Sequence, residues 1–203
     1  MSGRFIAFEG GEAAGKSTQS ERLAERLDAV RTREPGGTPL GAAIRRHFLD
    51  PATGDLDART EALLMAADRA HHVREVVRPA LAAGRHVVTD RYLFSSIAYQ
   101  AHGRGLDPAG VAMLNRWATE GLLPDVVVLL DVPVAEARRR VADAAPDRLE
   151  SEDVAFHERV RAGFHAQAAA DPDRWAVLDG TRPPEEVATA VWAAVTDRLP
   201  DLA

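Results

Sequence analysis

Short apolar runs recur along the chain, and each ends at a turn or at a charged residue. The four clearest cover residues 4–8, 86–90, 126–131 and 175–179. A weaker run covers residues 29–33. In the third run five consecutive residues are Val or Leu, and such continuous runs are typical of strands that are buried on both faces. The pattern therefore predicts four strands and a weaker fifth.

Segments of helical length separate these runs, at residues 17–28, 59–83, 108–121 and 184–199. The last segment carries Val187, Val191, Val195 and Leu199 at four-residue spacing, which predicts a stripe that faces the core. Strands that alternate with helices indicate an α/β fold with a mostly parallel sheet. Because no repeat or linker interrupts the 203 residues, we expect a single domain over 1–203.

Composition narrows the functional classes. Apolar residues make up 46% and charged residues 28% of the chain, as in ordinary globular proteins. A net charge of −6 argues against a nucleic-acid-binding surface. With no cysteine, disulfides, thiolate catalysis and cysteine-based zinc sites are excluded. Neither a signal peptide nor a membrane-spanning run is present, so we expect a cytoplasmic protein that does not bind membranes.

The strongest single motif is a glycine-rich loop. Residues 10–17 read GGEAAGKS, which is G-x-x-x-x-G-K-[ST] between a predicted strand and a predicted helix. Glycines allow backbone N–H groups to face phosphate oxygens, and the helix N-terminus adds its positive dipole. Lys16, the only lysine in the chain, would be exposed and reach the β- and γ-phosphates, while Ser17 would bind Mg²⁺. The predicted nucleotide-binding residues are Gly10, Gly11, Glu12, Ala13, Ala14, Gly15, Lys16, Ser17 and Thr18.

The rest of the chain distinguishes among phosphate-loop proteins. A GTPase would need an N-K-x-D element, which is impossible here because Lys16 is the only lysine. A small-molecule kinase needs a second anion site for its acceptor. Asp90 and Arg91 directly follow the run 86–90, and Arg33 and Arg69 are further candidates. At a strand's carboxyl end, Asp90 could hold Mg²⁺ while Arg91 binds a phosphate through two hydrogen bonds.

Four further segments resemble motifs of one family. Residues 90–100 (DRYLFSSIAYQ) resemble the D-R-Y-x-x-S-x-x-A-Y-Q signature of thymidylate kinases. Residues 32–41 (TREPGGTPLG), 67–70 (ADRA) and 147–150 (DRLE) resemble that family's other motifs. Together with the glycine-rich loop they occur in the family's order and cover most of the chain, so the ordered set is far more specific than any one motif.

This resemblance implies a P-loop kinase fold: a five-stranded parallel sheet flanked by helices on both faces, with a short lid at about 138–152. It also implies ATP as phosphoryl donor and dTMP as acceptor, giving ADP and dTDP for dTTP biosynthesis. Mg²⁺ would be held by Ser17 and Asp90. The family usually forms homodimers, so we expect a homodimer here.

The resemblance also assigns residues to the acceptor. Glu12 would lie near the 3′-hydroxyl, Arg69 at the thymine edge, and Tyr99 against the sugar. Arg91 and Arg45 would hold the acceptor phosphate. Met65 stands where the family usually has a phenylalanine, and Met is apolar and polarizable. The full predicted set for the acceptor is Glu12, Arg33, Glu34, Pro35, Arg45, Met65, Arg69, Arg91, Ser96, Tyr99 and Gln100.

One catalytic cation is missing from its usual positions. Position 13 is Ala, and residues 141–146 contain no basic side chain. An arginine beside the transferring phosphoryl group can be worth ~10³–10⁵ in rate. Arg138, Arg139, Arg140 and Arg148 are the candidates; we favour Arg148 because it lies in the DRLE motif, and we assign Arg140 to ATP. The predicted catalytic residues are Lys16, Arg91, Arg148 and Glu12.

Two other functions remain open. A different small-molecule kinase, such as a deoxynucleoside kinase, would leave Arg91 and Arg45 without an acceptor phosphate. A nucleotide-binding regulator without turnover would not need Lys16, Ser17 and Asp90 together. The three tryptophans of the chain are better explained as core or dimer contacts than as residues that stack on a ligand.

Overall fold

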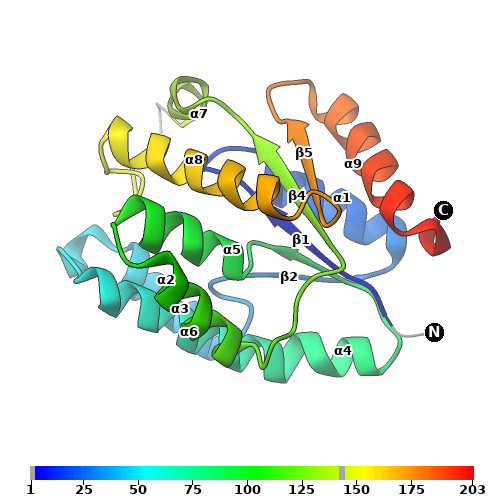
Figure 1. The fold of residues 1–203 in the computed structure, drawn as a ribbon, viewed down its shortest axis with the longest axis horizontal. Coiled ribbons are helices and arrows are strands. Elements are labelled where there is room, and N and C mark those ends of the chain that lie inside the picture. The colour runs from blue at the N-terminus through cyan, green and yellow to red at the C-terminus, as the bar shows by residue number, and fades with distance from the viewer. Residues whose placement is uncertain (1–2, 142–144) are drawn as a thin grey trace.

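Five parallel strands form one sheet in a computed structural model of the chain, which describes residues 3–141 and 145–203 (Figure 1). Each pair of neighbouring strands is parallel. This order and direction confirm the predicted fold class, and the predicted strand boundaries are correct to within one residue. Across the sheet the strands are β2 (Val30–Arg33), β3 (Val87–Asp90), β1 (Phe5–Glu9), β4 (Val126–Asp131) and β5 (Trp175–Asp179).

Helices cover both faces of the sheet, which explains the continuous apolar runs. On β1, Ile6 and Phe8 pack in one core with side chains of α1 (Lys16–Leu27) and α9 (Pro184–Arg198). Successive strand residues point to opposite faces, and Phe5 and Ala7 accordingly pack in a different core on the other side. Figure 1 shows α1 and α9 together on one side of the sheet and α8, α5 and α6 across it.

The remaining helical elements follow the chain order. They are α2 (Pro39–Leu49), η1 (Pro51–Thr53), α3 (Ala58–His72), η2 (Val73–Val77), α4 (Arg78–Ala82), α5 (Leu93–Ser96), η3 (Ile97–Gly103), α6 (Pro108–Ala118), α7 (Val134–Arg140), α8 (Val154–Ala170) and η4 (Pro200–Leu202). The helix predicted over 59–83 is the run of α3, η2 and α4. Its π-helical turn η2 ends at Val77, two residues before Pro79, which has no N–H to continue the regular ladder. Within 3–141 and 145–203, no helix is long and apolar enough to cross a membrane.

Our sequence analysis gave no range for four of these helices, α2, α5, α7 and α8, although residues 150–153 were interpreted as a helix start. The largest omission is α8, whose buried residues Phe156, Val160, Phe164 and Ala168 are four residues apart. This is the spacing that predicted α9, so the signal for α8 was present in the sequence. The shorter α2 begins at a cap in which the Thr38 hydroxyl accepts a hydrogen bond from Gly41 N.

Close contact between α8 and η3 builds one wall of the site. A Cβ atom on Gly163 would lie 2.7 Å from the ring of His102, so only glycine allows the two helices to approach this closely. The Tyr99 ring of η3 then lies 6.2 Å from the Phe156 ring and 6.2 Å from the Phe164 ring, both on α8. These edge-to-face contacts fix the orientation of Tyr99.

The predicted lid at 138–152 begins in α7, which ends at Arg140. Residues 142–144 lie outside the described residues. Beyond them the chain docks on the end of α2, where Arg148 N donates a hydrogen bond to Leu49 O over 3.0 Å. This contact places the DRLE segment at the C-terminal end of α2, the helix that also carries Arg45.

Candidate active site

The glycine-rich loop connects β1 to α1 and takes left-handed backbone conformations. Gly10 has φ 142°, and an added Cβ would lie 2.5 Å from Leu130 O. Gly15 has φ 88° and directly precedes α1. Ala13 also lies in the left-handed region, with φ 52°, which is unusual for a residue with a side chain. The backbone thus turns in the way that the loop's glycines predict.

We expected Lys16 to be exposed, but the structure buries it, with only 6% of the residue exposed. Its ammonium group donates a hydrogen bond to Gly11 O over 2.6 Å. Burial, together with the positive charge of Arg91, lowers the pKa of Lys16 to about 8. A phosphate beside this ammonium group would oppose that shift, because a nearby negative charge favours the charged form.

The two predicted metal ligands lie next to each other. Ser17 Oγ donates a hydrogen bond to Asp90 Oδ2 over 2.6 Å. No group of three or more His, Cys, Asp or Glu suited to a metal occurs among residues 3–141 and 145–203. A single carboxylate with a hydroxyl is nevertheless a donor set that suits Mg²⁺, which takes its other ligands from water and substrate phosphates.

Arg91 connects the glycine-rich loop with the neighbouring pocket. Its guanidinium donates hydrogen bonds to Gly10 O over 2.9 Å and to Glu12 Oε1 over 2.8 Å. Tyr99 OH donates to the same Glu12 oxygen over 2.8 Å. Burial alone would raise the pKa of Glu12, but the charges of Arg91 and Lys16 lower it to about 2. Glu12 is therefore a fixed negative charge between two cations.

Glu9, a residue that our sequence analysis missed, holds the backbone that follows Arg91. Its buried carboxylate accepts hydrogen bonds from Tyr92 N over 2.9 Å, Ser95 N over 3.2 Å and Ser95 Oγ over 2.6 Å. Arg91 itself has φ 70°, a conformation that costs about 1–3 kcal/mol and needs support from its surroundings. A charged residue at the end of the buried strand β1 was the available sequence signal. Burial raises the pKa of Glu9 to about 7, although Ser95 and Arg91 oppose that rise.

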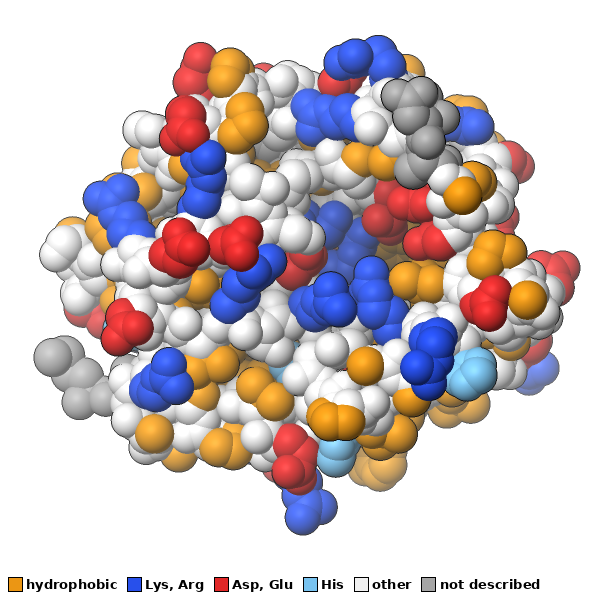
Figure 2. All heavy atoms as spheres, turned by 180° about the vertical axis from the view of Figure 1, so that it is seen from behind, with side chains coloured by type: hydrophobic (Ala, Val, Ile, Leu, Met, Phe, Trp, Pro, Cys, Tyr) orange, Lys and Arg blue, Asp and Glu red, His pale blue; other side chains and the backbone are white. Residues whose placement is uncertain are grey.

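Arginines from three elements gather beside the glycine-rich loop. Arg33 at the end of β2, Arg45 on α2 and Arg91 after β3 line a hollow of about 330 Å³ together with residues of the loop. Figure 2 shows basic side chains around a hollow in the middle of one face. Burial and the charges of Arg33 and Arg91 lower the pKa of Arg45. Glu12, Glu34 and Asp90 line the hollow as well, but its three guanidinium groups offer the paired N–H donors that suit phosphate groups.

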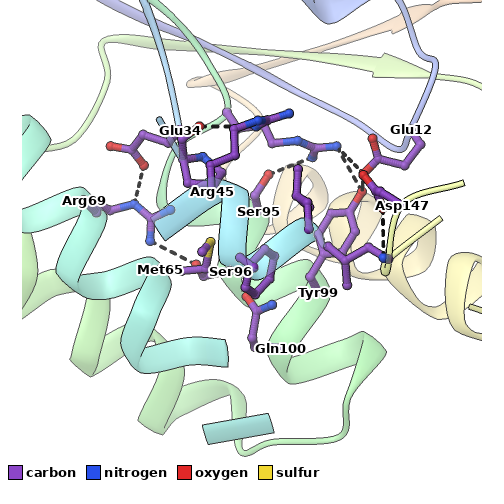
Figure 3. Close-up of a pocket in the computed structure, with 15 residues that line it drawn as sticks. Glu12, Glu34, Arg45, Met65, Arg69, Ser95, Ser96, Tyr99, Gln100 and Asp147 are labelled. Carbon is purple, nitrogen blue, oxygen red and sulfur yellow. Dashed lines mark hydrogen bonds and ion pairs between the residues drawn. The ribbon is translucent and has the colours of Figure 1, made fainter. Parts of the chain in front are cut away.

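A second pocket opens next to this hollow and contains every predicted acceptor residue except Arg33, which lines the hollow instead. In Figure 3, Arg69 and Glu34 lie at one end of the pocket, and Glu12 and Tyr99 at the other. Its lining also includes residues that our sequence analysis did not assign to the acceptor. These are Phe48, Leu49, Ser95, Asp147 and Leu149.

Glu34 uses its carboxylate to orient Arg69. One oxygen accepts a hydrogen bond from Arg69 Nε over 2.6 Å, and the other lies 2.8 Å from His72 Nδ1. The far side of the His72 ring bonds to the Thr32 hydroxyl over 2.6 Å. Arg69 in turn donates to Ser96 Oγ over 3.0 Å. The carboxylate of Glu34 thus binds protein groups, and its predicted contact with substrate would involve other atoms of the residue.

Two of the four candidate arginines, Arg140 and Arg148, occupy different places. Arg140 donates hydrogen bonds to Ala13 O over 3.1 Å and to Gly180 O over 3.0 Å, so it lies on the glycine-rich loop. Arg148 donates to Glu61 Oε1 over 2.6 Å and to Phe48 O over 2.9 Å, and its side chain is 8% exposed. The structure therefore brings Arg140, and not Arg148, to the loop.

Comparisons with known proteins agree on one family. A family model described as "Thymidylate kinase" matches residues 8–191. The thymidylate kinase of Thermomicrobium roseum is 54% identical over 200 residues, which cover 95% of this chain and 94% of that protein. That of Clavibacter michiganensis is 53% identical, with 94% and 93% covered. The crystal structure of thymidylate kinase from Ehrlichia chaffeensis superimposes with a TM-score of 0.81 at 31% identity, covering 97% of this chain and all of that one.

Titration of Glu9 should affect stability. Its pKa in the folded protein, about 7, is above its ordinary value of 4.5, so the folded state binds the proton more tightly. As pH rises from about 4.5 to about 7, the wild type should therefore lose roughly 3 kcal/mol of unfolding free energy relative to Glu9→Gln. Urea denaturation of both proteins across this range measures the difference. A difference that stays constant with pH would contradict the burial of an ionisable Glu9.

Proposed function

The chain belongs to the thymidylate kinase family, and we propose that it transfers the γ-phosphoryl group of ATP to dTMP, giving ADP and dTDP for dTTP synthesis. One observation carries this proposal. Arg91 lines both the phosphate hollow beside the glycine-rich loop and the adjoining pocket. A phosphorylated acceptor in that pocket would present its phosphate at the place where the donor's phosphates end.

The glycine-rich loop and its neighbours would bind ATP. Lys16 would contact the donor phosphates. Arg140, which donates a hydrogen bond to Ala13 O, would also contact the nucleotide. Ser17 and Asp90 would hold Mg²⁺. When bound, Mg²⁺ neutralises charge on the donor phosphates. The chain's own residues would align the acceptor oxygen with the γ-phosphorus, and this positioning supplies most of the rate.

The pocket matches the parts of dTMP from phosphate to base. Arg45 and Arg91 lie where they would hold the acceptor phosphate, and Tyr99 would contact the sugar. Arg69 lies at the far end, where it would donate to an oxygen of the base. Met65 lines the same end and offers an apolar surface to the thymine ring. The cytoplasmic location that we expect from the sequence remains a prediction.

An acceptor panel tests this function against its alternatives. ADP release should be measured with ATP and, in turn, dTMP, dUMP, thymidine, dCMP and dGMP. We expect dTMP to support the fastest release. Faster release with thymidine would identify a deoxynucleoside kinase. We disfavour that function because thymidine has no phosphate for Arg45 and Arg91 to bind. No release with any acceptor would identify a nucleotide-binding regulator.

Replacement of Lys16 tests the donor site. Lys16→Arg should lower kcat by roughly 10²–10³-fold, because a planar guanidinium cannot replace a compact ammonium group enclosed by backbone groups. Thermal unfolding should show that the variant is folded, since among the described residues the ammonium group's hydrogen bond is to a backbone oxygen of the same loop, Gly11 O. Near-normal kcat in this variant would show that Lys16 does not contact the transferred group.

The geometry also selects an arginine for the transferring phosphoryl group. Arg148 could reach the loop only by leaving Glu61, and breaking a buried ion pair costs about 3–5 kcal/mol. Arg140 already lies on Ala13, and its partners are two backbone oxygens and the part-exposed Glu136 in place of a buried carboxylate. We therefore assign the role to Arg140, in place of Arg148, which the family motif favoured.

The two arginines should respond differently to truncation. Arg140→Ala should lower kcat at least tenfold with little change in the KM for dTMP, the pattern of an interaction made chiefly in the transition state. Arg148→Ala should instead lower the unfolding free energy by about 3 kcal/mol while kcat is retained. Arg139→Ala is the matched control, because the Arg139 side chain is 74% exposed and pairs with Glu136. Loss of kcat in Arg148→Ala alone would restore the original assignment.

An exposed apolar surface supports the predicted homodimer. Leu63 on α3 is 58% exposed, and Met113 and Trp117 on α6 are 71% and 79% exposed. The two helices pack against each other, so these side chains belong to one side of the molecule. Large apolar side chains gathered in this way mark a protein–protein interface, and we propose that a second copy of the chain covers them.

A charge placed on this surface should prevent dimerisation. Trp117→Glu should give a monomer in light scattering, because the interface would bury an unpaired carboxylate. Val154→Glu is the control, since Val154 is 50% exposed at the start of α8, where an acid is favourable. A wild-type monomer, or a dimeric Trp117→Glu, would contradict the proposed interface.

A further inference from the structure

Glu61 is a fully buried carboxylate behind the base end of the pocket, and no catalytic role involves it. It lies on α3 and is 0% exposed. Arg104 binds both of its oxygens, with Nη2 3.0 Å from Oε1 and Nε 3.2 Å from Oε2. Arg148 adds a third contact to Oε1 over 2.6 Å. A carboxylate paired with two guanidinium groups is ionised and can only accept hydrogen bonds.

This acceptor determines how the side-chain amide of Gln100 lies. Gln100 lines the pocket, and its Nε2 donates to Glu61 Oε2 over 3.3 Å. The opposite orientation would place the amide oxygen against the carboxylate, two acceptors without a proton between them. The NH₂ group therefore faces Glu61. Among the residues that the structure describes, none donates to the carbonyl oxygen of Gln100, and this oxygen is not one of the sealed, unpartnered atoms.

The pocket thus presents a hydrogen-bond acceptor at Gln100, beside Arg69, whose guanidinium already donates to Glu34, Ser96, Asn115 and Tyr92 O. Thymine and uracil carry an N–H donor at N3 beside carbonyl acceptors, whereas cytosine has an acceptor at N3 and an amino donor next to it. An acceptor held at Gln100 would match the first pair of bases and oppose cytosine. A buried polar group that faces the wrong partner is costly, and sites built on such hydrogen bonds discriminate strongly.

We propose that Glu61 is a specificity-determining positioning residue, which holds the Gln100 amide so that its carbonyl selects a base with a proton on N3. The inference rests on the proposed function, because it takes a nucleoside monophosphate to be the occupant of the pocket. Arg104 and Arg148 keep Glu61 charged and in place. The ion pair with Glu61 holds Arg148 away from the glycine-rich loop, and through Glu61 the same ion pair contributes to substrate selection.

Glu61→Gln tests the inference through a ratio. The substituted amide can donate as well as accept, so Gln100 would be free to turn its NH₂ group toward the pocket. The ratio of kcat/KM for dTMP to that for dCMP should fall at least tenfold, partly because activity with dCMP rises. A merely structural role would lower both activities together and leave the ratio unchanged. Arg104→Lys is the control, since it keeps both a cation and the carboxylate, and its ratio should match the wild type.

If Glu61→Gln does not fold, Glu61→Asp provides a second test of the inference. Aspartate retains the charge for both arginines but withdraws the carboxylate from Gln100, so the ratio should still fall, by at least threefold. A wild-type ratio in either folded, active variant would overturn the inference and leave the proposed function standing. A wild-type enzyme without dTMP-dependent ADP release would instead overturn the proposed function and this inference with it.

Discussion

The ion pair between Arg91 and Glu12 is the contact on which the rest of the site depends. Strands β1 and β3 are parallel neighbours, so the residues that follow them meet at one edge of the sheet. Glu12 comes from the loop after β1, and Arg91 directly follows β3. Their pairing joins the donor loop to the acceptor pocket. Tyr99 of η3 donates a hydrogen bond to the same Glu12 carboxylate, so the wall formed by α8 and η3 contacts this ion pair too.

Buried glutamates in and behind the pocket orient the groups that would meet substrate. Glu9 holds the backbone after Arg91, Glu34 holds Arg69, and Glu61 holds Gln100. Each carboxylate is at most 2% exposed and accepts at least two hydrogen bonds. Removing one partner of such a buried pair is expensive, so these contacts lock the orientation of side chains that would otherwise be mobile. The pocket is therefore shaped before any ligand arrives, as efficient binding requires.

Much of this arrangement could be predicted from residue order alone. The strands follow from continuous apolar runs, and the donor loop follows from a motif whose spacing is dictated by phosphate geometry. The acceptor residues came from family motifs, and all but Arg33 lie in one pocket. The burial of Lys16 and the partner of Arg148 could not be predicted, because both depend on segments far apart in sequence. Glu61 and Arg148 are 87 residues apart, and no local pattern connects them.

The most direct test is the affinity of the nucleotide-free protein for dTMP compared with thymidine, measured by calorimetry. The account holds that Arg45 and Arg91 bind the acceptor's phosphate, and charge-assisted hydrogen bonds of this kind contribute about 1.5–3 kcal/mol each. Two of them predict that dTMP binds roughly 10²–10⁴-fold more tightly than thymidine. Equal affinity for the two ligands would show that these arginines do not bind an acceptor phosphate, and would contradict the central claim.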